Sequence, residues 1–185
     1  MNFYNLLRKL PVVGSVFRIV NAYVYQGDVD CQCKIAPLKL WWSRIFKKMF
    51  WLVIFVGVLF LIKYESILDW TAADTILSVF PSVLGFGIGA FALLFIMPSN
   101  FMIFLTQKRE RLGFGPEIVP VDMGYPLIVF TFVMAIAGLN KMFPSSAFNV
   151  FSIWAFFYGL AMALELITFL FNASVIIQKL ISKDN

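Results

Sequence analysis

Residues 148–177 read FNVFSIWAFFYGLAMALELITFLFNASVII, and Glu165 is the only charged residue in this run. A helix crosses the hydrocarbon core of a bilayer with about 20 apolar residues, at about 1.5 Å of rise per residue. The run therefore predicts a transmembrane helix. At about 45 Å, this helix must tilt or project beyond the lipid.

Three further apolar runs precede this one, and we expect transmembrane helices at about 44–63, 76–97 and 125–139. Apolar residues make up 61% of the 185 residues and charged residues 14%. Soluble domains have about 45–50% and about 25%, so a soluble fold of this size could not bury the excess. We predict an all-α polytopic membrane protein with four transmembrane helices, at about 44–63, 76–97, 125–139 and 148–177.

The chain before the first span also contains a helical pattern. Apolar residues recur at helical spacing in residues 3–10 and again, after Pro11, in residues 12–23, with charged and polar residues between them. This pattern predicts one or two amphipathic helices that lie in the membrane interface. We therefore divide the chain into a cytoplasmic and interfacial segment, residues 1–43, and a four-helix transmembrane domain, residues 44–185.

The basic residues predict the orientation. Of the 15 Lys and Arg residues, all except Lys63 and Lys141 fall in segments that four spans place on one side of the membrane. Cytoplasmic loops carry such an excess, so we expect both termini in the cytoplasm. The candidate contacts to anionic lipid or to a cytoplasmic partner protein are Arg8, Lys9, Arg18, Lys108, Arg109 and Arg111. The amphipathic segment would then be either a simple anchor or a docking face.

Small residues form two stripes in the predicted spans. Gly85 and Gly89 are four residues apart in the second span, and Ala155, Gly159 and Ala163 repeat at the same spacing in the fourth. Small residues let helix backbones approach closely in lipid. The favoured explanation of the stripes is packing inside one bundle or between subunits, and the alternative for the second span is a flexible or cavity-lining helix, since glycine also lowers helix stability. Because there are two stripes, we expect a homo-oligomer, with a tetramer favoured.

The fourth span also carries a polar stripe, formed by Tyr158, Glu165, Thr168 and Asn172. A charge in the membrane costs at least about 2.5–3.5 kcal/mol, and we expect no basic residue at the depth of Glu165. One interpretation is a protonated Glu165 that hydrogen-bonds across a helix interface. The other is a carboxylate that faces a water-filled pathway or acts as a protonation switch.

The residue types give no indication of catalysis. The chain has no histidine, and its two cysteines, Cys31 and Cys33, are too few for a convincing metal site. The glycine-rich run of the second span has no lysine after it and is no phosphate-binding loop. We expect no enzyme activity and no cofactor.

One stretch resembles a segment of small bacterial membrane proteins found beside defence genes. This stretch is FPSVLGFGIGAFALL, residues 80–94. Together with the layout of four spans after a basic N-terminal segment, it resembles the membrane subunit of the Kiwa antiphage system. The resemblance implies a bacterial inner-membrane oligomer that responds to phage at the envelope. It also implies a cytoplasmic partner that binds DNA, so that no direct contact of this chain with nucleic acid is expected.

These observations favour an oligomeric sensor or scaffold subunit in antiphage defence, which recruits a cytoplasmic partner protein. The first alternative is a small ion channel or pore-forming effector with Glu165 facing the pore. The second is a structural subunit of a larger membrane complex.

Overall fold

The computed structural model describes residues 10–63, 70–92, 99–107 and 115–184, which are all-helical apart from short connections. Four stretches are long and apolar enough to cross a membrane, namely Leu38–Ile62, Ala72–Ala92, Ile118–Met142 and Ser146–Gln178. The predicted fold class is therefore confirmed. In chain order the elements are α2 (Val13–Val24), η1 (Val29–Gln32), α3 (Leu38–Trp41), η2 (Trp42–Phe46), α4 (Lys47–Ile62), α6 (Ala72–Ala92), α7 (Ser99–Gln107), α9 (Ile118–Met142) and α10 (Ser146–Asp184).

The helix ends differ from the predicted ones. α9 begins at Ile118 rather than near 125, and it includes the charged Asp122. α6 begins at Ala72 rather than 76, and residues 93–97 of the predicted second span lie outside the described residues. α7 is a short helix between the second and third spans, where no helix was predicted. Charged and polar residues can continue a helix when other parts of the protein pair with them, and sequence hydropathy does not detect this.

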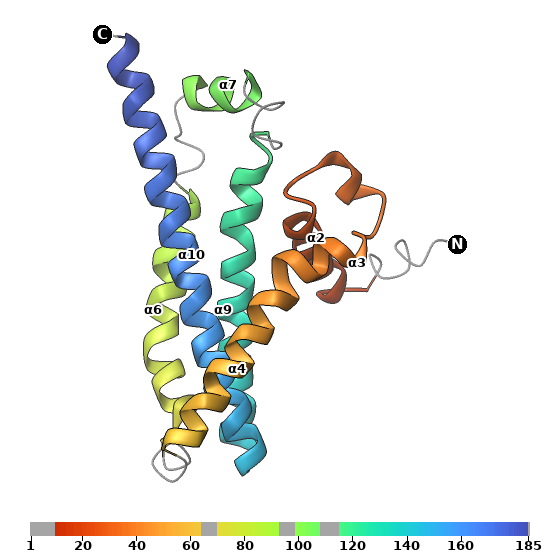
Figure 1. The fold of residues 1–185 in the computed structure, drawn as a ribbon, viewed down its shortest axis with the longest axis vertical. Coiled ribbons are helices and arrows are strands. Elements are labelled where there is room, and N and C mark those ends of the chain that lie inside the picture. Colours follow the sequence, from red (N-terminus) through yellow and green to blue (C-terminus); the bar gives the residue numbers. More distant parts are fainter. Residues whose placement is uncertain (1–9, 64–69, 93–98, 108–114, 185) are drawn as a thin grey trace.

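The core lies among α6, α9 and α10, which run side by side (Figure 1). Phe80 of α6 and Phe130 of α9 are fully buried, with their ring centroids 5.8 Å apart. Gly159 of α10 lies directly beneath the Phe80 ring, so that a Cβ atom there would clash with it. The close approach of α6 and α10 thus depends on a residue without a side chain.

The first span runs obliquely to these three helices (Figure 1). Its helix is continuous from α3 through η2 to α4, and η2 is a π-helical turn in which the Lys47 N–H bonds the carbonyl of Trp42. α4 contacts α10, for example through Phe55 and Phe157, whose rings meet edge to face at 5.2 Å. The oblique path brings the first turns of α4 close to the middle of α10.

The two small-residue stripes have different environments. In α10, Ala155 and Gly159 are buried inside the bundle and Ala163 is half-buried. In α6, Gly85 and Gly89 are exposed, and a Cβ atom at either would meet nothing within 4 Å. The glycine of α6 that packs inside the bundle is instead Gly87, against Leu127. The α10 stripe therefore serves packing within one chain, and only the α6 stripe faces outward.

The amphipathic helix α2 packs against α9. Its Asn21 is fully buried and holds the chain that follows α2. The Asn21 amide donates to the carbonyls of Cys31 and Lys34, at 3.0 and 2.9 Å, and its carbonyl accepts from the Ala36 N–H at 2.9 Å. One side chain thus satisfies three backbone groups of the segment that leads into the first span.

We expect Asn21→Ala to loosen this segment selectively. The substitution leaves two carbonyls and one N–H without their partner, and each unpaired buried group costs about 1–3 kcal/mol. Amide hydrogen exchange at Ala36 should accelerate by at least ~10-fold, which corresponds to about 1.4 kcal/mol. Asn172→Ala, at an exposed asparagine of α10, is the control. Unchanged exchange at Ala36 in Asn21→Ala would contradict this role.

Candidate functional site: a charge cluster shared by three spans

Glu165 of α10 forms an ion pair with Lys48 of α4. The Lys48 ammonium lies 2.6 Å from Oε1 and 2.7 Å from Oε2 of the carboxylate. Both side chains are about one third exposed, at 34% for Lys48 and 33% for Glu165. The expectation that no basic residue lies at the depth of Glu165 is therefore wrong.

The geometry of the two helices explains this error. Glu165 lies about 28 Å along α10 from Ser146, at about 1.5 Å per residue. That length is close to the ~30 Å thickness of the hydrocarbon core, so with Ser146 at one boundary of the core Glu165 would lie near the other boundary rather than at the centre. Lys48, in the first turn of α4, reaches Glu165, because the first span crosses α10 obliquely (Figure 1).

Tyr23 of α2 joins this ion pair. Its hydroxyl accepts from the Lys48 ammonium at 2.8 Å and donates to Oε1 of Glu165 at 2.9 Å. Burial and the neighbouring Glu165 carboxylate raise the pKa of the Tyr23 hydroxyl above its usual range, so the phenol keeps the proton that it donates. A single hydroxyl of the interfacial helix therefore contacts two spans at once.

A second ion pair lies beside the first. Arg44 of η2 donates to Oδ1 of Asp122 in α9 at 3.1 Å, and both side chains are about four fifths buried. The Arg44 guanidinium also stacks over the Tyr23 ring, 4.7 Å from its centroid, in a cation–π contact. The two cations and two carboxylates give the cluster no formal net charge, which is the arrangement that lowers the cost of charge in a membrane.

A row of aromatic rings extends from this cluster into the bundle. Tyr23 stacks on Tyr125 of α9 at 3.9 Å, and the hydroxyls of Tyr125 and Tyr158 share a hydrogen bond of 2.6 Å. Tyr158 stacks in turn on Trp154 at 5.3 Å. α2, α9 and α10 are therefore linked by both stacking and hydrogen bonds.

The predicted polar stripe of α10 does not act as one unit. Tyr158 is buried and bonds Tyr125, whereas Glu165 pairs with Lys48. Thr168 is exposed and donates back to the Leu164 carbonyl of its own helix, at 2.8 Å. Asn172 is exposed and borders a cavity of ≈ 300 Å³ that also reaches Arg44 and Asp122.

Of the six basic residues predicted to contact lipid or a partner protein, the structure describes only one. Arg18 is exposed on α2. The other five, Arg8, Lys9, Lys108, Arg109 and Arg111, lie outside the described residues. The prediction that they contact lipid or a partner protein stays a prediction.

The charge cluster joins the first span to α9 and to α10, and its charges neutralise one another. Each carboxylate is held by a cation from the first span, so that movement of that span must break or carry both ion pairs. Within the described residues no group of three or more Cys, Asp or Glu side chains is placed to hold a metal ion. Comparison with protein-family models, with curated proteins and with solved structures found no match to this chain.

Proposed function

We propose that this chain is a membrane sensor or scaffold subunit that recruits a cytoplasmic partner protein through its N-terminal segment. The observation that supports this most is Tyr23. Its hydroxyl bonds Lys48 of the first span and Glu165 of the last, so the position of α2 depends on how these two spans lie. A change in span packing would reach α2 directly, which is what a sensor that reports to the membrane surface requires.

The outward side of α2 supports a docking role. A groove of ≈ 590 Å³ runs between α2, the segment after it and the start of α9. Arg18 and Ile19 border it from α2, and both are exposed. Because Arg18 and Glu117 both line the groove, it suits an amphipathic segment of a partner protein that carries charges of both signs, with an acidic group at Arg18.

The setting that we propose is phage defence at a bacterial inner membrane, with both termini in the cytoplasm. It rests on the resemblance of residues 80–94 and of the four-span layout to the Kiwa membrane subunit. The outward-facing Gly85 and Gly89 of α6 are consistent with the homo-oligomer that we propose, with a tetramer favoured. α7 and the C-terminal end of α10 lie at one end of the bundle, and α2 lies beside the half of α9 nearer to that end (Figure 1).

The ion pair weighs against the channel alternative. A pore-lining Glu165 would face water, but both of its oxygens contact the Lys48 ammonium. We expect no ion flux in liposomes that contain the purified chain, with or without Glu165→Gln. A robust conductance that the substitution alters would favour the channel over the scaffold.

We expect Arg18→Glu to abolish recruitment without affecting the fold, because Arg18 is exposed and contributes no ion pair within the described residues. Co-purification with the cytoplasmic partner protein should fall by at least ~10-fold, the size expected for a reversed charge at an interface. The plaque count of a sensitive phage should rise correspondingly in cells that carry both genes.

Lys39→Glu, the same reversal at an exposed residue of α3, is the matched control and should leave both measurements unchanged. Full recruitment by Arg18→Glu would exclude α2 as the docking face. Equal losses in both variants would point to a general effect of surface charge, for example on anionic lipid.

A further inference from the structure

A cavity of ≈ 300 Å³ lies beside the ion pair of Arg44 and Asp122, among residues of η2, α7, α9 and α10. Its lining combines this ion pair and two exposed amide side chains, Gln26 and Asn172, with apolar residues. The apolar residues are Leu105, Ile118, Val119, Phe169, Ala173 and Ile176. Cavities of about 300–1,000 Å³ with a few convergent polar groups are typical of ligand sites, and this lining suits an amphipathic ligand.

The ion pair in this cavity is only partly hydrogen-bonded. A guanidinium has five N–H donors, and within the described residues Arg44 makes one hydrogen bond, from Nη2 to Oδ1 of Asp122 at 3.1 Å. Its Nε is buried and has no hydrogen-bond partner among these residues. No hydrogen bond reaches Oδ2 of Asp122 in the same part of the chain. The pair therefore leaves both donors and an acceptor for a ligand.

The level of the cavity along α10 favours a lipid headgroup as that ligand. Phe169 and Asn172 lie about 6–10 Å beyond Glu165, at about 1.5 Å per residue. The length of α10 places Glu165 near a boundary of the hydrocarbon core, and the headgroup layer extends about 5–8 Å beyond that boundary. The cavity is therefore at the level where the phosphates and amines of phospholipids lie.

The charges of the cavity select among headgroups. Arg44 and Asp122 together carry no net formal charge, so an anionic headgroup would meet the Asp122 carboxylate without a counter-charge. A headgroup with a phosphate and a primary ammonium can bond both residues, since phosphate pairs with guanidinium and ammonium with carboxylate. A trimethylated ammonium has no N–H group to donate to Asp122.

We propose that this cavity binds the headgroup of phosphatidylethanolamine. The phosphate accepts from unused N–H groups of Arg44, and the ammonium donates to Oδ2 of Asp122. The apolar residues of the cavity cover the glycerol and the first methylenes of the acyl chains. The proposal depends only on the cavity, so it holds whether or not α2 recruits a partner.

The test uses the purified full chain in detergent micelles and native mass spectrometry. Phosphatidylethanolamine, phosphatidylcholine and phosphatidylglycerol with identical acyl chains are added in equal amounts, and the retained lipid is measured. We expect wild type to retain phosphatidylethanolamine at least ~five-fold over each of the other two. This preference corresponds to about 1 kcal/mol, the contribution of one hydrogen bond.

Asp122→Asn should reverse the selectivity. The substitution keeps an oxygen that accepts from Arg44 but removes the charge that binds the ammonium. The cavity then holds a guanidinium without a counter-charge, so the ratio of retained phosphatidylglycerol to phosphatidylethanolamine should rise by at least ~10-fold. A change of preference cannot result from a simple loss of folding.

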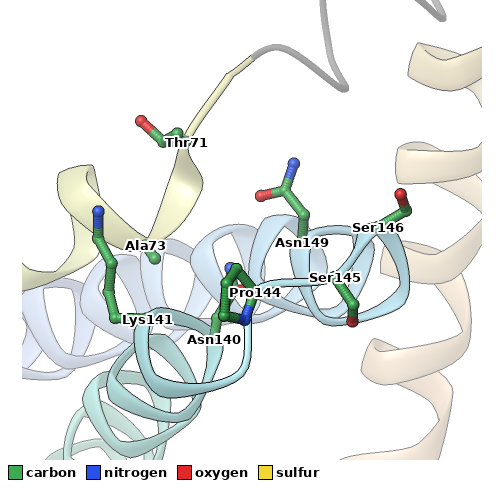
Figure 2. Close-up of a pocket in the computed structure, with 8 residues that line it drawn as sticks. All are labelled: Thr71, Ala73, Asn140, Lys141, Pro144, Ser145, Ser146 and Asn149. Atoms are coloured by element: carbon green, nitrogen blue, oxygen red, sulfur yellow. The ribbon is translucent and has the colours of Figure 1, made fainter.

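Asp74→Asn is the matched control, because it removes a carboxylate from an ion pair at the other end of the bundle. Asp74 pairs with Lys141 at 2.6 Å, beside a hollow of ≈ 440 Å³ whose lining residues Figure 2 shows. There the Asn149 amide already donates to the Trp70 carbonyl, at 3.3 Å. The lipid preference of Asp74→Asn should equal that of wild type.

A second pair of variants tests the place of binding. Asn172 is exposed at the cavity, so Asn172→Phe should obstruct it without disturbing the core and should lower retention of phosphatidylethanolamine. Ser174→Phe adds the same ring at an exposed residue of α10 that does not line the cavity. Its retention should match that of wild type.

The remaining outcomes would overturn the proposal. Equal retention of phosphatidylcholine by wild type would exclude the bond from the ammonium to Asp122, and a preference for phosphatidylglycerol would make the site anionic. An unchanged preference in Asp122→Asn, or equal effects of Asn172→Phe and Ser174→Phe, would place binding elsewhere. If free glycerophosphoethanolamine bound as tightly as the lipid, the ligand would be a solute and the lipid assignment would be wrong.

Discussion

Lys48→Met is expected to lower the free energy of unfolding by about 2 kcal/mol, although it makes the chain more apolar. The substitution leaves Glu165 and the Tyr23 hydroxyl without the cation that both contact. Removing one partner of a fully buried ion pair costs about 3–5 kcal/mol, and an exposed pair contributes about 0–1 kcal/mol. Because both side chains are about one third exposed, an intermediate cost is expected. Unfolding of the purified chain in mixed micelles, followed by tryptophan fluorescence, measures it.

The neighbouring residue provides the control. Lys47 is exposed, so Lys47→Met makes the same chemical change one position away and should alter stability by less than ~0.5 kcal/mol. The double variant Lys48→Met with Glu165→Leu should recover most of the loss, because it removes both charges together. If Lys47→Met and Lys48→Met were equally destabilising, or if the double variant were the least stable, the ion pair would not hold these spans together.

Gly159→Leu is expected to be the most damaging single substitution in the bundle. A side chain at this position meets the buried ring of Phe80, and a Cβ atom would also lie 3.4 Å from Val133. Overpacking a well-filled core costs about 1–3 kcal/mol and occasionally more, and here the backbones of two helices must also move apart. We expect a loss of about 3 kcal/mol in the same unfolding experiment, with a lower yield of folded protein.

Gly85→Leu provides the comparison, because a Cβ atom at Gly85 meets nothing within 4 Å. Its unfolding free energy should stay close to that of wild type. If α6 forms the proposed contact between subunits, the oligomer mass in detergent should fall instead. A large loss of stability in Gly85→Leu would contradict its outward position, and an unchanged mass would place the subunit contact elsewhere.

The sequence was sufficient for the four spans, because uninterrupted apolar runs are a local property. The ends of the spans were less predictable. Asp122 lies one turn into α9 and is paired with Arg44, which is far away in the sequence. A hydropathy profile counts the cost of placing Asp122 in a membrane helix, but it does not count the ion pair with Arg44 that offsets this cost. The predicted third span therefore began too late.

The charge cluster was only half predictable. Glu165 was identified as unusual, since a carboxylate within an apolar run needs an explanation. Its partner was missed because the level of Lys48 depends on the oblique path of the first span, which no local pattern contains. A search for compensating charges could have found it, as Arg44 and Lys48 are four residues apart and thus share a helix face.

Two polar residues of α2 were missed for a different reason. In the helical pattern of residues 12–23, Asn21 only interrupts the apolar positions and Tyr23 counts as one of them. Both are buried, and both bond groups outside their own helix. An amphipathic pattern predicts which face of a helix is buried, but it does not predict that polar groups of other elements pack against that face.

The π-helical turn at Trp42–Phe46 has a consequence for changes in chain length. Its hydrogen bonds span five residues rather than four, so this turn contains one more residue than an ordinary α-helical turn. Deleting one residue between Trp42 and Arg44 would let the helix continue in regular α form. Because a π-helical turn and an α-helical turn each complete one rotation, the residues before the deletion would keep nearly the same orientation relative to Lys48. A single-codon deletion here should therefore leave the N-terminal segment packed on the bundle, whereas the same deletion within the regular helix α4 would turn the residues before it by about 100° relative to those after it.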